Sequence, residues 1–265
     1  MNTLRLRKLL HGGRTLLTPL DHGVAMGPIP GIARIRETVT ELIEIDGVNA
    51  IVFHPGSLGL CMELLAPAPG VGTILHLNAS ANLSPQPNRK VMTATVEDAL
   101  RLGADGVSVH INLGNPHDGE MLADLGAVAG TCRHWGMPLL AMIYVRGDGQ
   151  DPLDPAANAA AARVAMELGA DLIKVAHPGT SSGCAQVVDA VDVPVVFAGG
   201  PFEADDAEFL AAARGAMDAG AAGLAVGRNV FQRPDRSRFI AALARIVHQD
   251  ASVAEAQQAL EGSTS

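Results

Sequence analysis

The sequence predicts a single-domain (β/α)8 barrel over residues 1–265, and three observations support this fold. Eight short apolar segments rich in β-branched residues recur along the 265 residues. Segments with helical spacing lie between them, and several end in a glycine suited to a left-handed cap. No linker rich in Gly, Pro or Ser divides the chain. Alternating strands and helices indicate parallel strands joined by crossovers, and eight such units close a barrel. A doubly wound open sheet is the alternative.

The expected elements follow one another in regular order. The strands cover residues 16–22, 49–55, 72–79, 106–114, 138–144, 172–178, 193–200 and 222–229. The helices between them include residues 32–45, 96–102, 120–135, 155–168 and 205–219. Three similar phrases, LGADGV (102–107), LGADLI (168–173) and AGAAGL (219–224), mark places where a helix stops and a strand starts.

Composition and charge exclude several classes of protein. The chain has 19 Lys and Arg against 28 Asp and Glu, a net charge of −9, so extended nucleic-acid binding is not expected. A local basic pocket for a small anion remains open. No apolar run approaches the roughly 20 residues that span a bilayer, and the N-terminus lacks the apolar core of a signal peptide. We therefore expect a cytoplasmic globular protein without a membrane partner.

Polar residues alternate with apolar ones inside several of the expected strands. In LIKVAHP (172–178) the β-branched Ile173 and Val175 suit the helix-facing side, which turns Lys174 into the barrel. The carboxyl ends of the strands are where enzymes with this fold carry out their chemistry. The same reasoning gathers a set of polar residues around that end: Asp21, His54, His76, Asn78, His110, Asn112, Tyr144 and Lys174.

Lys174 is the most informative of these residues. The chain has only two other lysines, Lys8 in a polar N-terminal segment and Lys90 in a polar loop. A lysine in an apolar strand loses the solvation of its charged form, so its free amine can attack a carbonyl and form a Schiff base. Tyr144, the single tyrosine, could relay a proton. A snorkelling or Asp21-paired lysine and a core tyrosine with a satisfied hydroxyl are the structural alternatives.

The last two strands carry a second signal. They end in AGGP (198–201) and VGRN (226–229), a position where many barrels hold a phosphate on backbone N–H groups. Arg228 adds a charge that can grip a phosphate in two places. Glycines that serve only as tight turns are the alternative. The Gly/Pro-rich segment 19–31 after the first strand is of the kind that covers an active site.

Three histidines allow a different chemistry. His54, His76 and His110 follow strands two, three and four, and three converging imidazoles could bind Zn²⁺ in a metal-dependent aldolase or hydrolase. No HxH or HExxH spacing is present, and a metal mechanism leaves Lys174 without a role, so we predict no metal. A catalytically silent barrel that binds a sugar phosphate or acts as a scaffold is the non-enzymatic alternative.

The motifs together resemble the class I (Schiff-base) aldolase family that contains the archaeal-type fructose-bisphosphate aldolases and the 2-amino-3,7-dideoxy-D-threo-hept-6-ulosonate synthases. The resemblance is carried by segments 19–31, 76–90, 102–114, 135–147, 168–179, 197–201 and 219–232. It implies a decameric or otherwise oligomeric (β/α)8 enzyme that needs no cofactor. It implies Lys174 as the Schiff-base lysine, Tyr144 as the proton donor and Asp21 as the acidic residue beside them. The implied substrate-binding residues are Gly199, Gly200, Gly227 and Arg228 for the phosphate, with His22, His54, His76, His110 and Arg146.

Three departures from the family pattern affect the expected substrate. HPG (54–56) replaces HKG, HLNAS (76–80) replaces HLSG, and YVRG (144–147) replaces YPRG. We therefore expect the family's reaction with a changed acceptor. The predicted reaction joins dihydroxyacetone phosphate or a similar ketose donor to L-aspartate 4-semialdehyde. Its product is a seven-carbon amino-keto sugar phosphate or its deoxy analogue, on an aminohydroxybenzoate or dehydroquinate route. The alternatives are a fructose-1,6-bisphosphate aldolase, disfavoured by Pro55, and a thiolase acting on a phosphorylated autoinducer.

Overall fold

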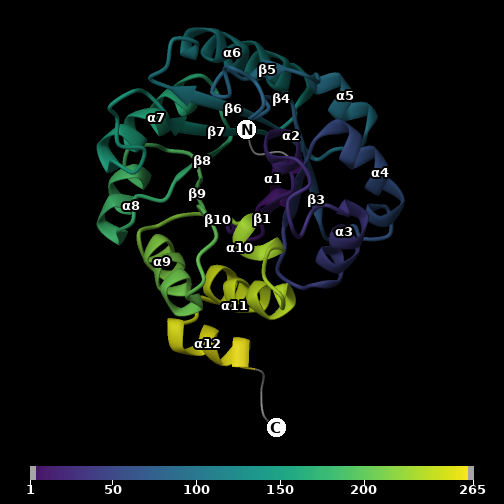
Figure 1. The fold of residues 1–265 in the computed structure, drawn as a ribbon, viewed down its shortest axis with the longest axis vertical. Coiled ribbons are helices and arrows are strands. Elements are labelled where there is room, and N and C mark those ends of the chain that lie inside the picture. Colours follow the sequence, from purple (N-terminus) through teal and green to yellow (C-terminus); the bar gives the residue numbers. More distant parts are fainter. Residues whose placement is uncertain (1–3, 262–265) are drawn as a thin grey trace.

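The computed structural model describes residues 4–261, in which eight parallel strands close into a barrel (Figure 1). The strand order around the ring is β1-β10-β9-β8-β7-β6-β3-β2. The open-sheet alternative is wrong because β10 pairs with β1 and completes the ring. The barrel strands are β1 (Thr15–Pro19), β2 (Ala50–Phe53), β3 (Gly72–His76), β6 (Gly106–Leu113), β7 (Leu139–Val145), β8 (Leu172–Ala176), β9 (Val195–Ala198) and β10 (Gly223–Ala225).

The helices lie mostly in a ring outside the strands, as Figure 1 shows. They are α1 (Leu4–Leu9), α2 (His22–Met26), α3 (Ile35–Glu44), α4 (Pro55–Leu65), α5 (Val96–Arg101), α6 (Asp118–Trp135), α7 (Pro155–Glu167), α8 (Ser181–Val188), α9 (Asp206–Asp218), α10 (Arg228–Phe231), α11 (Arg236–Gln249) and α12 (Val253–Glu261). The five predicted helices are present, and α3 begins three residues later than the predicted 32–45. Helix α4 escaped prediction because Gly56 and Gly59 are weak helix formers; burial of Leu58 and Cys61 compensates.

Local signals at the helix ends agree with the sequence. Thr95 and Asp98 form a reciprocal capping box at the start of α5. The glycines of the three repeated phrases, Gly103, Gly169 and Gly220, all have positive φ, at 68°, 104° and 88°. A left-handed residue there ends the helix and turns the chain toward the next strand.

The barrel interior is a separate apolar cluster inside the ring of strands. It contains Leu9, Leu17, Ala50, Val52, Ile74, Leu140, Met142, Leu172, Val196 and Ala225. Leu9 comes from α1 and fills the amino end of the barrel, where a Cβ on Gly72 would come within 2.7 Å of its side chain. Since the amino end is plugged, the cavity for substrate has to lie at the carboxyl end.

Two short segments cover part of that carboxyl end. Helix α2 follows β1, and a two-stranded hairpin of β4 (Asn78–Ala79) and β5 (Val91–Met92) follows β3. The two segments meet where the backbone N–H of Asn82 donates to the carbonyl of Ala25 at 3.0 Å. Segment 19–31, expected to cover the site, thus includes a helical turn.

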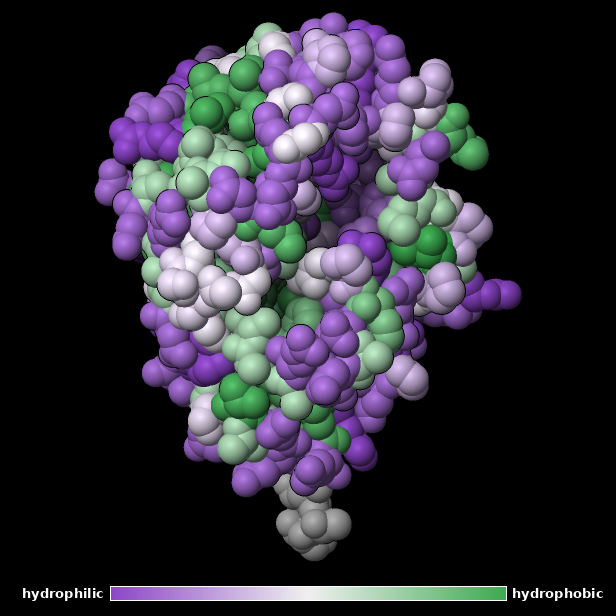
Figure 2. All heavy atoms as spheres, turned by 60° about the vertical axis from the view of Figure 1, so that its left-hand side comes forward, coloured by the Kyte–Doolittle hydropathy of each residue, from purple (hydrophilic) through white to green (hydrophobic). Residues whose placement is uncertain are grey.

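The face of the molecule drawn in Figure 2 carries many hydrophilic residues. Figure 2 shows hydrophilic residues across one face and around a recess in its upper half, with apolar residues scattered between them. None of the described helices is long and apolar enough to cross a membrane.

Candidate active site

A cavity of about 870 Å³ lies at the carboxyl ends of the barrel strands. The predicted catalytic and substrate-binding residues line it: Asp21, His22, His54, His76, His110, Tyr144, Arg146, Lys174, Gly199, Gly200, Gly227 and Arg228. Asn78 also lines the cavity, whereas Asn112 does not. The fold therefore brings together residues from all parts of the chain at one end of the barrel.

Lys174 lies inside the barrel and is 7% exposed. Its strand β8 places it level with Met142 of β7 and Val196 of β9, which belong to the interior apolar cluster. The snorkelling alternative is wrong because the side chain is buried in the cavity wall. Among the described residues, no carboxylate oxygen lies within 4.0 Å of its amine, so a tight ion pair with Asp21 is absent too.

Tyr144 lies at the end of the neighbouring strand β7. Its ring centroid is 4.9 Å from that of His110, and the guanidinium carbon of Arg146 is 5.2 Å from it. Within residues 4–261 the phenol hydroxyl has no protein hydrogen-bond partner. A hydroxyl without a partner beside a cavity is available to a bound substrate, unlike that of a core tyrosine.

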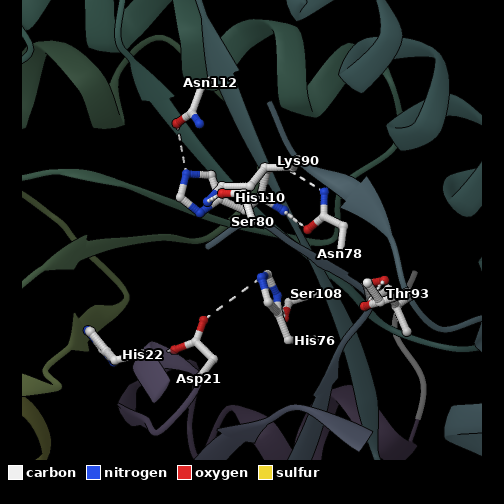
Figure 3. A network of polar contacts seen from close by, with 11 residues as sticks. Asp21, His22, His76, Asn78, Ser80, Lys90, Thr93, Ser108, His110 and Asn112 are labelled. Carbon is white, nitrogen blue, oxygen red and sulfur yellow. Dashed lines mark hydrogen bonds and ion pairs between the residues drawn. The ribbon is translucent and has the colours of Figure 1, made fainter. Parts of the chain in front are cut away.

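Asp21 lies between two histidines, as Figure 3 shows. One carboxylate oxygen is 3.5 Å from Nδ1 of His22 and the other is 3.8 Å from Nε2 of His76. Burial alone would raise the pKa of Asp21, but the charges of His76, His22 and Lys174 hold that pKa well below its usual value. Asp21 is thus an ionised acceptor at the wall of the cavity.

The histidines have separate partners rather than a shared centre. Nδ1 of His76 is 2.8 Å from the hydroxyl of Ser108, and Nε2 of His110 is 2.8 Å from Oδ1 of Asn112. His54 stacks edge-on against His76, with ring centroids 5.2 Å apart. In the described part of the chain, no three His, Cys, Asp or Glu side chains are placed to ligate one metal ion. The convergence that the zinc alternative required does not occur.

Burial of neutral histidines makes the stability of the protein sensitive to acid. Burial lowers the pKa of His76 to about 4, although Asp21 opposes this shift. In the unfolded state the imidazole of His76 binds a proton near pH 6.5, whereas in the folded state it stays neutral until about pH 4. The stability of the folded protein therefore falls as the pH drops from 6.5 to 4. At about 1.4 kcal/mol per unit of pKa, His76 alone accounts for about 3 kcal/mol.

We expect the free energy of unfolding to depend less on pH in a His76→Asn variant, which lacks the titrating ring. Urea unfolding of both proteins at pH 7 and pH 5 measures it. Asp21 does not contribute to this dependence. Its lowered pKa stabilises the folded protein, and that stabilisation is lost only as the pH falls below the unfolded pKa of Asp near 3.9. Equal losses of stability in the two proteins between pH 7 and pH 5 would contradict the assignment.

The glycine-rich ends of β9 and β10 form a second part of the site. Gly200 has a φ of 70°, and a Cβ on Gly227 would lie 2.6 Å from Cε1 of His22. Among the described residues, the backbone N–H groups of Gly200 and Gly227 have no backbone acceptor, and Nε of Arg228 is buried without a partner. Unpaired donors grouped in this way favour an oxyanion.

We call the donors of Gly200, Gly227 and Arg228 the oxyanion cradle. Asn229 fixes this cradle and was not predicted from the sequence. It is fully buried, and its side-chain amide donates to the carbonyls of Gly199 and Pro201 at 2.9 and 2.6 Å. Its side-chain oxygen accepts the backbone N–H of Glu203 at 2.7 Å. Asn229 thereby ties the loop after β9 to the turn after β10.

Lys90 is the other residue that sequence reasoning missed. Predicted to lie in a polar loop, it is only 8% exposed and lines the cavity. Its amine donates to the hydroxyl of Ser80 at 2.6 Å. Burial and the charge of Arg146 lower the pKa of Lys90 to about 8. The rarity of lysine in this chain is the signal that could have singled it out.

Comparison with known proteins places this geometry in a family. The model of DeoC/LacD family aldolases matches residues 15–233. The 2-amino-3,7-dideoxy-D-threo-hept-6-ulosonate synthase of Halobacterium salinarum is 43% identical over 250 residues, covering 94% of this chain and 92% of that protein. The 2-amino-4,5-dihydroxy-6-oxo-7-(phosphonooxy)heptanoate synthase of Streptomyces griseus is 43% identical over 251 residues, covering 93% and 90%.

A solved structure shows the same fold with its lysine modified. It is an archaeal fructose-1,6-bisphosphate aldolase whose catalytic lysine is covalently bound to the carbinolamine intermediate of the substrate. It is 30% identical, with a TM-score of 0.84, covering 92% of this chain and 98% of that one. A buried lysine inside the barrel beside a group of unpaired N–H donors, together with these similarities, shows that the chain is an aldolase of the DeoC/LacD family.

Proposed function

We propose that this aldolase joins dihydroxyacetone phosphate, or a ketose phosphate that yields it, to L-aspartate 4-semialdehyde. The observation that supports this most directly is the buried amine of Lys174 between the oxyanion cradle and Tyr144. The names of the relatives at 43% identity describe seven-carbon amino-keto products of this kind. On this proposal the product feeds an aminohydroxybenzoate or dehydroquinate route, the latter leading to aromatic amino acids.

The proposed reaction begins at Lys174. Its amine adds to the ketone of the donor, and loss of water gives an iminium ion. The iminium draws electrons from the neighbouring carbon, which loses a proton and leaves an enamine. The enamine carbon attacks the aldehyde, a new carbon–carbon bond forms, and the aldehyde oxygen takes up a proton. Water then hydrolyses the imine, replacing the water lost at the start.

The surrounding residues have complementary roles in this scheme. The N–H groups of Gly200 and Gly227 and the guanidinium of Arg228 hold the donor phosphate. Gly199 lines the same part of the cavity, but its N–H donates to the carbonyl of Ala225. Asp21 accepts protons, His22, His54, His76 and His110 line the reacting groups, and Arg146 faces the acceptor. Holding both partners in one cavity removes part of the entropic barrier, an effect worth roughly 7–11 kcal/mol in well-oriented systems.

Borohydride trapping tests the proposal. We expect a reduced adduct on Lys174 after incubation with dihydroxyacetone phosphate, seen by mass spectrometry of the digested protein. Acceptance of L-aspartate 4-semialdehyde in a panel of aldehydes then tests the second substrate. An unmodified Lys174, together with activity lost on chelation, would overturn the scheme.

The Tyr144→Phe variant tests proton delivery. Its ring fills the same space, so the barrel and the imine step persist, while the carbon–carbon step loses its proton donor. We expect kcat to fall by about 10²- to 10³-fold, in the range of general acid catalysis. The measurement is turnover with saturating substrates, alongside borohydride trapping. An unchanged kcat would show that another group supplies the proton.

Fructose-1,6-bisphosphate cleavage is the second candidate. It is favoured by the 30% identity to the archaeal aldolase structure, which covers 92% of this chain. It requires a second phosphate on the acceptor side of the cavity. Rates with glyceraldehyde 3-phosphate and with L-aspartate 4-semialdehyde, measured under the same conditions, decide between the two reactions.

We further propose that the chain acts as one domain within a cytoplasmic homo-oligomer, a decamer by family resemblance. The proposed partners are small sugar phosphates and aldehydes, without nucleic acid, membrane or metal. Light scattering of the purified protein tests the subunit number.

A further inference from the structure

Lys90 is a buried cation that the protein leaves without a carboxylate. In the described residues, no acidic oxygen lies within 4.0 Å of its amine, which has the hydroxyl of Ser80 as its single protein partner. An ammonium group has three protons to donate. Burying such a charge without a counter-ion is costly, so the uncompensated position favours an anion that arrives from the cavity.

Hydrogen bonds in the surrounding loop hold Lys90 in place. The hydroxyl of Ser80 donates onward to the carbonyl of Pro87 at 2.6 Å, and the side-chain amide of Asn112 donates to the carbonyl of Asn88 at 2.8 Å. Pairing of β4 with β5 closes the loop at its base. Figure 3 shows Lys90 beside Ser80 and His110, apart from Asp21 and His22.

The barrel places Lys90 opposite the oxyanion cradle. Its loop connects β3 to the segment before β6, whereas the cradle follows β9 and β10. In the closed ring β3 and β6 lie across from β10 and β9, with β8 and β7 between them on one side. Lys174 and Tyr144 belong to those intervening strands, so the reacting centre lies between the two cationic ends.

Arg146 links the two ends. Its charge lowers the pKa of Lys90 after the larger effect of burial, and it also lowers the pKa of Arg228, where burial is again the main cause. Arg146 has no ion pair among the described residues either. Three uncompensated cations along one cavity suit a reaction in which both substrates carry negative groups.

On the basis of the function proposed above, each substrate carries one anionic group, and the cavity has a cationic end for each: the oxyanion cradle and Lys90. With the donor phosphate in the cradle and its carbonyl at Lys174, the aldehyde must approach from the far side. The other end of a semialdehyde is a carboxylate, and that end points toward the hairpin. We infer that Lys90, assisted by Arg146, binds the carboxylate of the aldehyde acceptor and thereby selects acidic aldehydes.

The test compares Lys90→Met with Arg89→Met. Arg89 is the preceding residue, but it pairs with Glu120 at 2.9 Å outside the cavity, so its variant loses the same charge from the same loop. The acceptors are succinate semialdehyde, glyceraldehyde 3-phosphate and butanal, which end in a carboxylate, a phosphate and a methyl group. The measurement is kcat/KM for each, with dihydroxyacetone phosphate as donor.

We expect Lys90→Met to lower kcat/KM for succinate semialdehyde by about 10- to 100-fold, the range for a hydrogen bond to a charged group, and to leave butanal unchanged. Arg89→Met should leave both unchanged. Ser80→Ala removes the hydrogen-bond partner of the Lys90 amine. It should also lower kcat/KM for succinate semialdehyde and not for butanal, but by a smaller factor than Lys90→Met. A loss confined to glyceraldehyde 3-phosphate would overturn the carboxylate assignment, whereas a loss for both anionic acceptors supports it.

Two results would overturn the inference as a whole. One is an equal loss for all three acceptors, which would make Lys90 a structural support of the loop. The other is no loss for any of them. Borohydride trapping of dihydroxyacetone phosphate on Lys174 in Lys90→Met separates this question from the proposed function. An adduct with lost acceptor selectivity supports both, and no adduct in the wild-type protein removes the function itself.

Discussion

Lys174→Met will abolish turnover while leaving the barrel intact. Methionine fills a similar volume among Met142, Val196 and the rest of the interior cluster, and volume-conserving changes usually cost under about 1.5 kcal/mol. Without the amine no imine forms, so we expect kcat to fall by more than about 10⁴-fold, as for loss of a nucleophile in other enzymes. The measurement is initial rate, paired with the thermal midpoint of unfolding.

Lys8→Met is the matched control for this variant. It makes the same chemical change at the opposite end of the barrel, where Lys8 pairs with Asp105 at 2.9 Å. We expect its turnover to equal that of the wild-type protein. Turnover that survives in Lys174→Met would rule out the Schiff-base mechanism, whatever the result at Lys8.

The position of Lys174 was predictable because strand periodicity fixes it. Successive residues of a strand point to opposite faces, so the β-branched neighbours Ile173 and Val175 set the direction of the lysine between them. The structure places both neighbours in the outer core and Lys174 inside. The same argument placed His76, His110 and Tyr144 at the cavity, because each belongs to a regular strand of the barrel.

Lys90 could not be found in this way because no periodic element contains it. It precedes β5, which has two residues and pairs with a two-residue partner across a polar loop. Two residues are too few to show alternation. Its burial depends on contacts with Ser80 and on the loop folding back over the barrel, which are tertiary effects. Asn112, predicted to face the cavity, instead supports His110 and the loop carbonyl of Asn88.

The oxyanion cradle contains residues that were predicted from the sequence and one that was not. Glycines at the ends of β9 and β10 were predicted from their flexibility, and Gly227 proves necessary because a side chain there would meet His22. Asn229, which holds the two loops together, was not predicted. A buried asparagine that bonds to two carbonyls and one N–H leaves no sequence pattern, since its partners lie 26 to 30 residues away.

Asp21→Asn will have the second-largest effect on the reaction. Asparagine has the same shape but cannot accept a proton, so we expect kcat to fall by about 10²- to 10⁴-fold, the range for loss of general base catalysis. The charge around the site changes as well. Asp21 opposes the lowering of the pKa of His76 and His22 by burial, so both histidines should become still harder to protonate in the variant. Initial rates and ring-proton NMR titrations of the histidines measure the two effects.

Asp46→Asn is the control for Asp21→Asn. Asp46 is an exposed carboxylate that lies in a groove with His11 and His248, outside the cavity that holds Lys174. Its loss changes the net charge by the same amount without touching the site, so turnover should be unchanged. Because the pKa of Asp21 is held well below its usual value, the carboxylate stays ionised from pH 5 to 9, and the rate ratio of wild type to Asp21→Asn should be constant over that range. A ratio that shrinks toward pH 5 would mean that Asp21 takes up its proton there. Its surroundings would then be too weak to keep this carboxylate ionised and ready as the base.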